Sequence, residues 1–423
     1  MGAANTAESS LYEDSLKSSN SGKLNVTIIK VPRKITLLTP LHDGSKNDGS
    51  GGKLQKAMIY DNKYEFAVTL MNGDEPANGS QYCWAIEYVS PDTSKGQMVR
   101  KELGNLGSKA KIEIDDLDFC GCDLTVKAYL DDPDQSCELV QFVHNRFRWF
   151  DAKRVQTQVQ ERMQEPWRID QGSSSLCGMA ALYYVTIKRS PDRYRKIAHE
   201  LHRTGLCKID DFSIKPSDSM YEIKPKDSDY QHMRMWEADW IVLAGTRSSE
   251  SNLGYHGIET GSWDQFTAIN WPGMMEDLVK KIAGYGNVKS VGIGLMHPVV
   301  KKLFSYKGED VSAALSDLKQ IDGFKTKGHQ VLLMIDANMI GDTPNYSVGD
   351  IQNSHWVVYE GGLSDSKGRV GFKVYTWGFD PASIRKYDLT GALSIPRPEV
   401  VMTPNGISNE AFESNYYGYI EAS

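Results

Sequence analysis

Short runs of alternating apolar and polar residues fill the first third of the chain and constrain its fold most. Clusters of Gly, Asn, Asp and Pro separate these runs, the clearest of which begin at Leu24, Tyr64, Tyr82 and Leu124. Alternation with a period of two is typical of strands that bury one face. We therefore expect residues 23–150 to form an all-β, sandwich-like domain. The preceding residues 1–22 are small and polar and are expected to be disordered.

Two further features of this region bear on its architecture. The segment His42–Lys53 (HDGSKNDGSGGK) is polar and rich in glycine, which predicts a surface loop or a short linker. Trp84 stands beside Cys83 in the third run, but the Cys-Trp-Cys spacing of an immunoglobulin domain is absent. The sequence thus predicts a sandwich without assigning its family.

The size and charge of the chain exclude several classes of protein. A length of 423 residues favours more than one domain. With 40% hydrophobic residues, 24% charged residues and a net charge of −7, nothing favours nucleic acid or an anionic membrane as a partner. There is no apolar run long enough for a membrane span and no leader-like start. We expect synthesis in the cytoplasm and, if the protein is exported, a route without a cleaved signal peptide.

Six cysteines in a chain of this length do not form a dense disulfide framework. Four of them lie in the N-terminal third: Cys83, Cys120, Cys122 and Cys137. A zinc site there would require an unusual C-x-C pair, so buried free thiols are favoured over a metal site. No metal or organic cofactor is predicted.

The remainder of the chain, residues 151–423, has a different pattern. Residues 151–165 are charged and rich in Gln, as a helix or a linker would be, and helices are predicted at 178–188, 192–204 and 272–283. Strands are predicted after them, at 290–294, 330–335, 355–359 and 370–375. Helices followed by strands indicate an α+β domain.

A glycine- and serine-rich loop in this second domain runs directly into an apolar helix, and Cys177 stands at the junction. Backbone N–H groups at a helix N-terminus favour an anion, so we expect a lowered pKa for this thiol. Gln171, six residues earlier, can fold back beside the sulfur. Its amide and the backbone N–H of Cys177 would then stabilise the oxyanion that forms when a thiolate attacks a carbonyl.

His355 opens a Val-rich strand, a position in which a general base is held firmly and can reach a neighbour. A third residue should orient its imidazole. A turn centred near residue 366 would bring Thr376 opposite His355, with Asp380 just beyond. Thr376 is better placed by strand pairing. Asp380 is favoured because a carboxylate stabilises an imidazolium, and a dyad without a third partner stays open.

These motifs resemble those of the papain-like cysteine peptidases, in particular the bacterial peptidases that process bacteriocins at double-glycine leaders. The nucleophile motif Q-x-x-x-x-x-C-G-x-A-A-L matches here from Gln171 to Leu182, and Ser354–Val358 matches the histidine motif. The resemblance spans residues 165–385. It implies a domain with a helical part and an antiparallel β part. It also implies that the catalytic residues follow one another along the chain in the order Cys, His, acid. This chain departs from the pattern by delaying its acid to Asp380.

A second resemblance concerns the segment from Asp239 to Met275, which is similar to poorly characterised bacterial proteins associated with type VI secretion. In such proteins a variable front domain precedes a papain-like toxin domain. The resemblance implies a secreted effector that acts on a protein or peptide substrate, with an immunity protein or a secretion component as further partner.

Three functions follow from these residues, in order of preference. The first is a cysteine peptidase in which Cys177 attacks, His355 transfers the proton and Gln171 helps to hold the oxyanion. The second is a deamidase, transglutaminase or acyltransferase that uses the same acyl-enzyme step. The third is a binding protein on a papain-like scaffold, because a fold does not imply a function.

Overall fold

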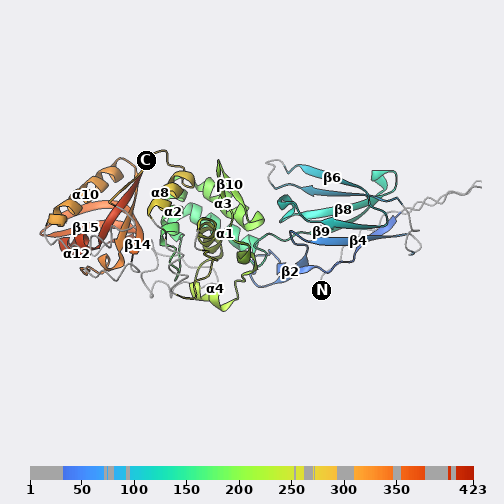
Figure 1. Cartoon of the computed structure of the whole chain (residues 1–423), viewed down its shortest axis with the longest axis horizontal. Coiled ribbons are helices and arrows are strands. Elements are labelled where there is room, and N and C mark those ends of the chain that lie inside the picture. Colours follow the sequence, from blue (N-terminus) through green and yellow to red (C-terminus); the bar gives the residue numbers. More distant parts are fainter. Residues whose placement is uncertain are drawn as a thin grey trace, which may run out of the picture. The chain divides into compact units, whose positions relative to one another are not determined.

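A computed structural model describes residues 32–70, 74, 81–91, 96–251, 254–261, 270, 272–292, 309–345, 354–376, 399–401 and 406–423. The residues expected to be disordered, 1–22, and the run that begins at Leu24 lie outside these ranges. The chain divides into two compact units (Figure 1). Unit 1 comprises residues 1–46 and 52–148, and unit 2 comprises residues 47–51 and 149–423.

Unit 1 is a sandwich of two antiparallel sheets. The three-stranded sheet has the order β1 (Pro32–Leu37), β4 (Lys63–Leu70), β7 (Lys109–Glu113). The four-stranded sheet has the order β6 (Met98–Asn105), β5 (Cys83–Val89), β8 (Asp123–Tyr129), β9 (Cys137–Phe142). Short 3-10 turns lie at Leu117–Phe119 and Pro133–Gln135. All strand pairs within the two sheets are antiparallel.

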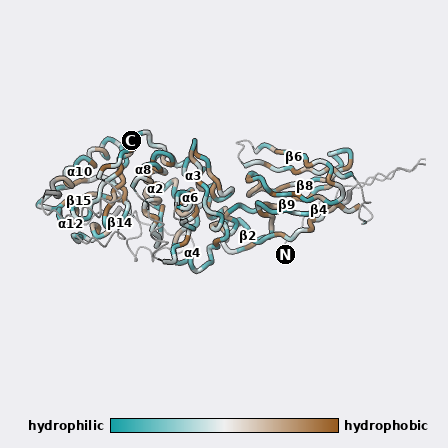
Figure 2. Tube along the Cα trace, in the orientation of Figure 1, coloured by the Kyte–Doolittle hydropathy of each residue, from teal (hydrophilic) through white to brown (hydrophobic). Residues whose placement is uncertain are grey.

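The core of the sandwich follows from alternation along its strands. Every second residue of β4 is buried, and hydrophobic and hydrophilic residues alternate along the strands in Figure 2. The indole of Trp84 is fully buried and donates to the carbonyl of Gly107 at 2.8 Å. The predicted strands at 64–70, 82–88 and 124–130 are β4, β5 and β8. Strands β6, β7 and β9 went unpredicted because their exposed faces carry charged residues.

The glycine-rich segment His42–Lys53 differs from its prediction as a loop or linker. Its first residues form β2 (His42–Ser45), which pairs antiparallel with β3 (Leu54–Ala57). Only the tip is irregular, and Gly49 and Gly51 adopt positive φ angles of 89° and 65° there. Glycine adopts such angles without the steric cost of a side chain, which explains the composition of this tip.

Most helices of unit 2 precede the strands of its larger sheet, as predicted, but β10 (Cys207–Ile209) and β11 (Phe212–Ile214) lie among the early helices, and α10 (Glu309–Thr326) and α12 (Asn409–Asn415) lie among the later strands. The segment at 151–165 is a helix, α1 (Ala152–Gln164), capped by the Asp151 carboxylate. The next two are α2 (Cys177–Arg189), which is almost wholly buried, and α3 (Pro191–Thr204), which ends at a left-handed Gly205. A π-helix, Trp240–Ala244, is also buried. The remaining elements of this part are η3 (Pro166–Arg168), η4 (Asp218–Glu222), α4 (Ser228–Met233), α5 (Glu237–Asp239), α6 (Gly245–Glu250) and α8 (Pro272–Lys281).

The strands β10 and β11 pair with each other in a small antiparallel sheet. A larger antiparallel sheet of unit 2 has, in spatial order, β12 (Val288–Val291), β18 (Tyr416–Ala422), β13 (Gln330–Asp336), β14 (Ser354–Ser366), β15 (Arg369–Tyr375) and β16 (Glu399–Val401), with β17 (Ile407–Ser408) also paired to β15. The helix α2 packs on β14. The helices α10 (Glu309–Thr326) and α12 (Asn409–Asn415) contribute to a core with the other face of the sheet (Figure 1). A short 3-10 turn, Ala337–Met339, follows β13.

The chain is therefore an α+β protein with antiparallel sheets, as its sequence predicts. The C-terminal strand β18 was not predicted, yet it lies between β12 and β13 inside the sheet. Within the part of the chain that the structure describes, no helix has the length and hydropathy needed to cross a bilayer.

Candidate active site

Cys177 is the first residue of α2, and its side chain is only 5% exposed. The backbone N–H groups of Trp356 and Gly178 point to its sulfur. Trp356 directly follows His355 in β14, so the fold places the sulfur against the strand that carries the predicted base. The helix and the strand also contact each other farther along, where Nζ of Lys188 in α2 lies 2.8 Å from Oε1 of Glu360 in β14.

The acidity of Cys177 differs from the prediction. Burial raises the pKa of this thiol to about 11, although the N–H groups of Trp356 and Gly178 act in the opposite direction. The carboxylate of Glu259 raises the pKa further. The expectation of a lowered pKa is therefore wrong, because the loss of solvent outweighs the favourable helix N-terminus.

His355 lies at the start of β14 and is 7% exposed. Burial lowers the pKa of its imidazole to about 4, so the ring is neutral at pH 7. The sulfur of Cys177 meets the backbone N–H of the next residue, Trp356, and the described contact of the imidazole itself is with Thr376.

Thr376 is the residue that contacts the imidazole. Its Oγ1 lies 2.8 Å from Nε2 of His355, and its side chain is 3% exposed. The contact arises because β14 and β15 are joined by a tight turn at Lys367 and Gly368, with positive φ angles of 54° and 76°. This contact fixes one edge of the imidazole ring. Asp380, the alternative third residue, lies outside the described residues.

Gln171 is buried in the loop before α2, but the structure does not direct its amide to the sulfur. The side-chain Nε2 donates to the carbonyl of Ser174, and the Ser174 hydroxyl donates to the Gln171 carbonyl at 2.7 Å. The amide Oε1 is buried without a hydrogen-bond partner among the described residues.

Two buried polar residues beside the nucleophile were not predicted. Glu259 accepts the Ser175 N–H with both carboxylate oxygens, at 3.0 and 2.9 Å. Asn270 is fully buried, and its carbonyl accepts the indole N–H of Trp356 at 3.0 Å. A Cβ added to Gly178 would lie 2.6 Å from the Asn270 Cβ, so only glycine fits at this position. No motif in the sequence marks either residue, because each reaches the site from a distant segment.

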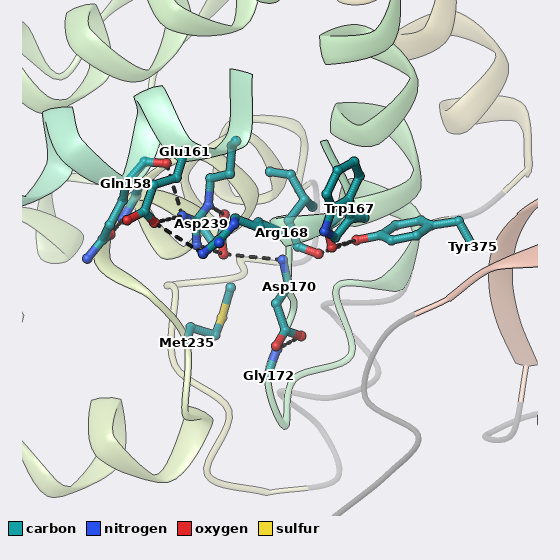
Figure 3. A network of polar contacts seen from close by, with 12 residues as sticks. Gln158, Glu161, Trp167, Arg168, Asp170, Gly172, Met235, Asp239 and Tyr375 are labelled. Carbon is teal, nitrogen blue, oxygen red and sulfur yellow. Dashed lines mark hydrogen bonds and ion pairs between the residues drawn. The ribbon is translucent and has the colours of Figure 1, made fainter. Parts of the chain in front are cut away.

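A buried ion pair supports the loop that carries Gln171 (Figure 3). The guanidinium of Arg162 forms a two-pronged contact with Asp239, with Nε–Oδ1 at 2.6 Å and Nη2–Oδ2 at 2.7 Å. Arg162 also donates to the carbonyl of Gln158 at 3.0 Å. Asp239 Oδ2 accepts the backbone N–H of Asp170, the residue before Gln171, at 3.2 Å. The start of the loop is thereby fixed to α1 and α5.

The cysteines outside the site are free thiols. Cys120, Cys122 and Cys137 are buried and Cys83 is half-buried, and none forms a disulfide. In the described ranges no group of three or more His, Cys, Asp or Glu side chains is arranged to hold a metal ion.

The neutral state of His355 predicts a specific loss of stability in acid. In the unfolded chain the imidazole binds a proton below a pKa of about 6.5, whereas the folded value is about 4. The unfolded state therefore binds more protons between these values, and stability falls as the pH decreases. We expect a loss of about 2.5 kcal/mol from this group between pH 7.5 and pH 4.5.

Urea unfolding of wild type and His355→Asn at both pH values measures this contribution to the free energy of unfolding. The variant should lose about 2.5 kcal/mol less than wild type over the same interval, whatever its stability at pH 7.5. His202 is a matched control, because burial also lowers its pKa to about 4. Replacement of His202 by Asn should likewise reduce the dependence of the free energy of unfolding on pH. An unchanged pH dependence in His355→Asn would show that the imidazole titrates normally.

Comparison with known proteins gives no relative for this chain. No family model matches it. Neither the curated proteins nor the solved structures contain a match.

Proposed function

We propose that unit 2 is a thiol hydrolase of the papain-like type that cleaves peptide bonds, with Cys177 as the nucleophile and His355 as the base. One observation carries the proposal. The Cys177 sulfur lies at the backbone N–H of Trp356, directly after His355, whose imidazole contacts Thr376. A thiol at a helix N-terminus, a neutral imidazole and an orienting hydroxyl are the groups that such chemistry requires.

The reaction proceeds in two steps. In the first, the sulfur attacks the carbonyl carbon, His355 takes the thiol proton and then gives it to the leaving amine, and a thioester remains on Cys177. In the second, His355 takes a proton from water as the water oxygen attacks the thioester, and the proton returns to the sulfur when the acid product leaves. Backbone N–H groups at the start of α2 stabilise the oxyanion in both steps. The predicted help from Gln171 would require its amide to turn from the Ser174 carbonyl toward the sulfur.

The reaction needs no preformed thiolate. With pKa values of about 11 for Cys177 and about 4 for His355, both groups are neutral at pH 7. Proton transfer to His355 therefore accompanies the attack. The secreted-effector role, with its immunity or secretion partner, stays a prediction from the sequence resemblance.

A small acyl donor tests the proposal, because Cys177 is only 5% exposed. We expect 4-nitrophenyl acetate to acetylate Cys177 with release of nitrophenolate, followed by hydrolysis of the thioester. Intact-mass analysis should show a single acetyl group, and peptide mapping should place it on Cys177. Cys177→Ala should abolish both the burst and the turnover.

Cys207→Ala is the matched control. Cys207 is a fully buried cysteine of the same unit, and burial raises the pKa of its thiol too. This variant should react like wild type. Acetylation spread over several cysteines, or turnover that persists in Cys177→Ala, would contradict the proposal and favour the binding-protein alternative. Turnover with added amine acceptors but none with water would favour acyl transfer over hydrolysis.

A further inference from the structure

The side chain of Tyr375 connects three parts of the candidate site. Tyr375 is the last residue of β15 and directly precedes Thr376, the residue that contacts His355. Its ring stacks on that of Tyr184, with centroids 3.9 Å apart and planes at 8°. Tyr184 stands seven residues after Cys177 in α2 and therefore lies on the same face of the helix, two turns on.

The hydroxyl of Tyr375 reaches the loop that leads to Cys177. It lies within hydrogen-bond distance of two backbone carbonyls, that of Trp167 at 2.8 Å and that of Ile169 (Figure 3). The single phenol proton is shared between these carbonyls. Both belong to the end of the 3-10 turn η3, from which the chain continues to Asp170 and Gln171. Tyr375 as a whole is only 3% exposed.

The loop has a second, independent anchorage beyond this point. Asp170 accepts the Gly172 N–H at 2.9 Å, and the Ser173 N–H donates to the carbonyl of Met233 at 2.7 Å. Gly172 has a φ of 58°, and a Cβ there would lie 2.3 Å from the Met233 carbonyl oxygen. Together with the Asp239 contact to Asp170, these bonds give the loop a fixed shape. Tyr375 is the link from this rigid loop to β15.

We infer that Tyr375 is a positioning residue that holds the nucleophile loop, helix α2 and the His355–Thr376 pair in one register. The inference rests on the proposed function. The tyrosine hydroxyl fixes the start of the loop, the ring fixes the helix that begins with Cys177, and the backbone passes directly to Thr376. Displacement of reacting groups by about 1 Å is enough to slow a reaction by about 100-fold.

The test compares two tyrosine-to-phenylalanine variants in full-length protein. Tyr375→Phe removes the hydroxyl and keeps the ring on Tyr184. The matched control is Tyr359→Phe in the adjacent strand β14, where the hydroxyl donates to Asp322 Oδ1 at 2.7 Å and the ring packs in the core with α10. Each variant loses one phenol hydrogen bond, so both melting temperatures should fall by a similar amount, about 2–4 °C.

The two variants should differ in acetylation of Cys177 by 4-nitrophenyl acetate. We expect Tyr375→Phe to lower the maximal rate about 10- to 100-fold with little change in KM, and Tyr359→Phe to stay within about twofold of wild type. If Tyr375 only stabilised the fold, the two variants would have similar acetylation rates. In a His355→Asn background the Tyr375→Phe change should have a smaller further effect, since one of the groups that Tyr375 positions is gone.

Equal rates in Tyr375→Phe and Tyr359→Phe would overturn the inference and leave the proposed function in place. So would a full additional loss in the His355→Asn background, because Tyr375 would then act independently of the base. If wild-type Cys177 is not acetylated in a His355-dependent manner, the proposed function fails and the inference fails with it. The wild-type and His355→Asn rates, measured first, separate these cases.

Discussion

Replacement of His355 by Asn is expected to lower the rate of Cys177 acetylation about 100- to 10,000-fold, the usual contribution of a general base. The effect should be large because burial raises the pKa of the Cys177 thiol to about 11 and leaves little thiolate at pH 7. Without an adjacent proton acceptor, the reaction must rely on that small fraction. The measurement is the burst rate of nitrophenolate release at pH 7.

The pH profile gives this prediction a second readout. Wild type should react nearly independently of pH from about 5 to 8, because the imidazole is neutral throughout this range with a pKa of about 4. His355→Asn should instead gain about tenfold in rate per pH unit, as expected for a thiolate-limited reaction far below the thiol pKa. Equal rates and profiles in the two proteins would show that His355 does not act on the thiol.

Two milder variants identify the third residue of the site. Thr376→Val keeps the shape of the side chain and removes the hydroxyl 2.8 Å from Nε2. It should lower the rate less than His355→Asn does, because the base is retained and only its orientation is weakened. Asp380→Asn should match wild type if Thr376 alone fills this role. A larger loss of acetylation rate in Asp380→Asn than in Thr376→Val would show that Asp380, the residue favoured from the sequence, orients the imidazole.

Replacement of Asp239 by Ala is expected to destabilise unit 2 by about 3–5 kcal/mol, since it leaves the buried charge of Arg162 unpaired. The side chains of this pair are 2% and 0% exposed, so water cannot replace the lost contact. The variant also removes the acceptor of the Asp170 N–H. Calorimetry of the full chain should show one transition shifted to lower temperature and the transition of unit 1 unchanged.

Two comparisons control for the loss of charge and of volume. Arg195→Ala removes an exposed pair with Asp192 on α3, with side chains 46% and 76% exposed, and should cost less than about 1 kcal/mol. The double variant Arg162→Met with Asp239→Leu should be more stable than Asp239→Ala, because it leaves no unpaired buried charge. A cost for Asp239→Ala as small as that of Arg195→Ala would contradict a supporting role for the buried pair.

Local sequence patterns predicted most of the elements around the site. The apolar run after Cys177 is α2, and the Val-rich run after His355 is the buried start of β14. Both depend on residues close in the chain, as helical and strand periodicities do. The turn between β14 and β15 was likewise visible in its Ser, Asp and Gly residues, which is why Thr376 could be named as a neighbour of His355.

Elements with mixed or unusual patterns were not predicted. Strand β18 is central in its sheet although its sequence, YYGYIEA, contains a glycine and ends the chain. The helix α10 was also missed, although its core residues Ala314, Leu318 and Ile321 follow helical spacing. Such elements are determined by the surface that they cover, which a local pattern does not contain.

The sequence by itself determined the candidate residues Cys177 and His355, the helix and strand on which they lie, and the division into a β part and an α+β part. Only the tertiary structure decided how acidic the thiol is, which hydroxyl meets the imidazole, and which residues support the loop. The physical reason is that desolvation and ion pairing depend on neighbours distant in sequence: Glu259, Asp239 and Tyr375 reach the site only when the chain has folded.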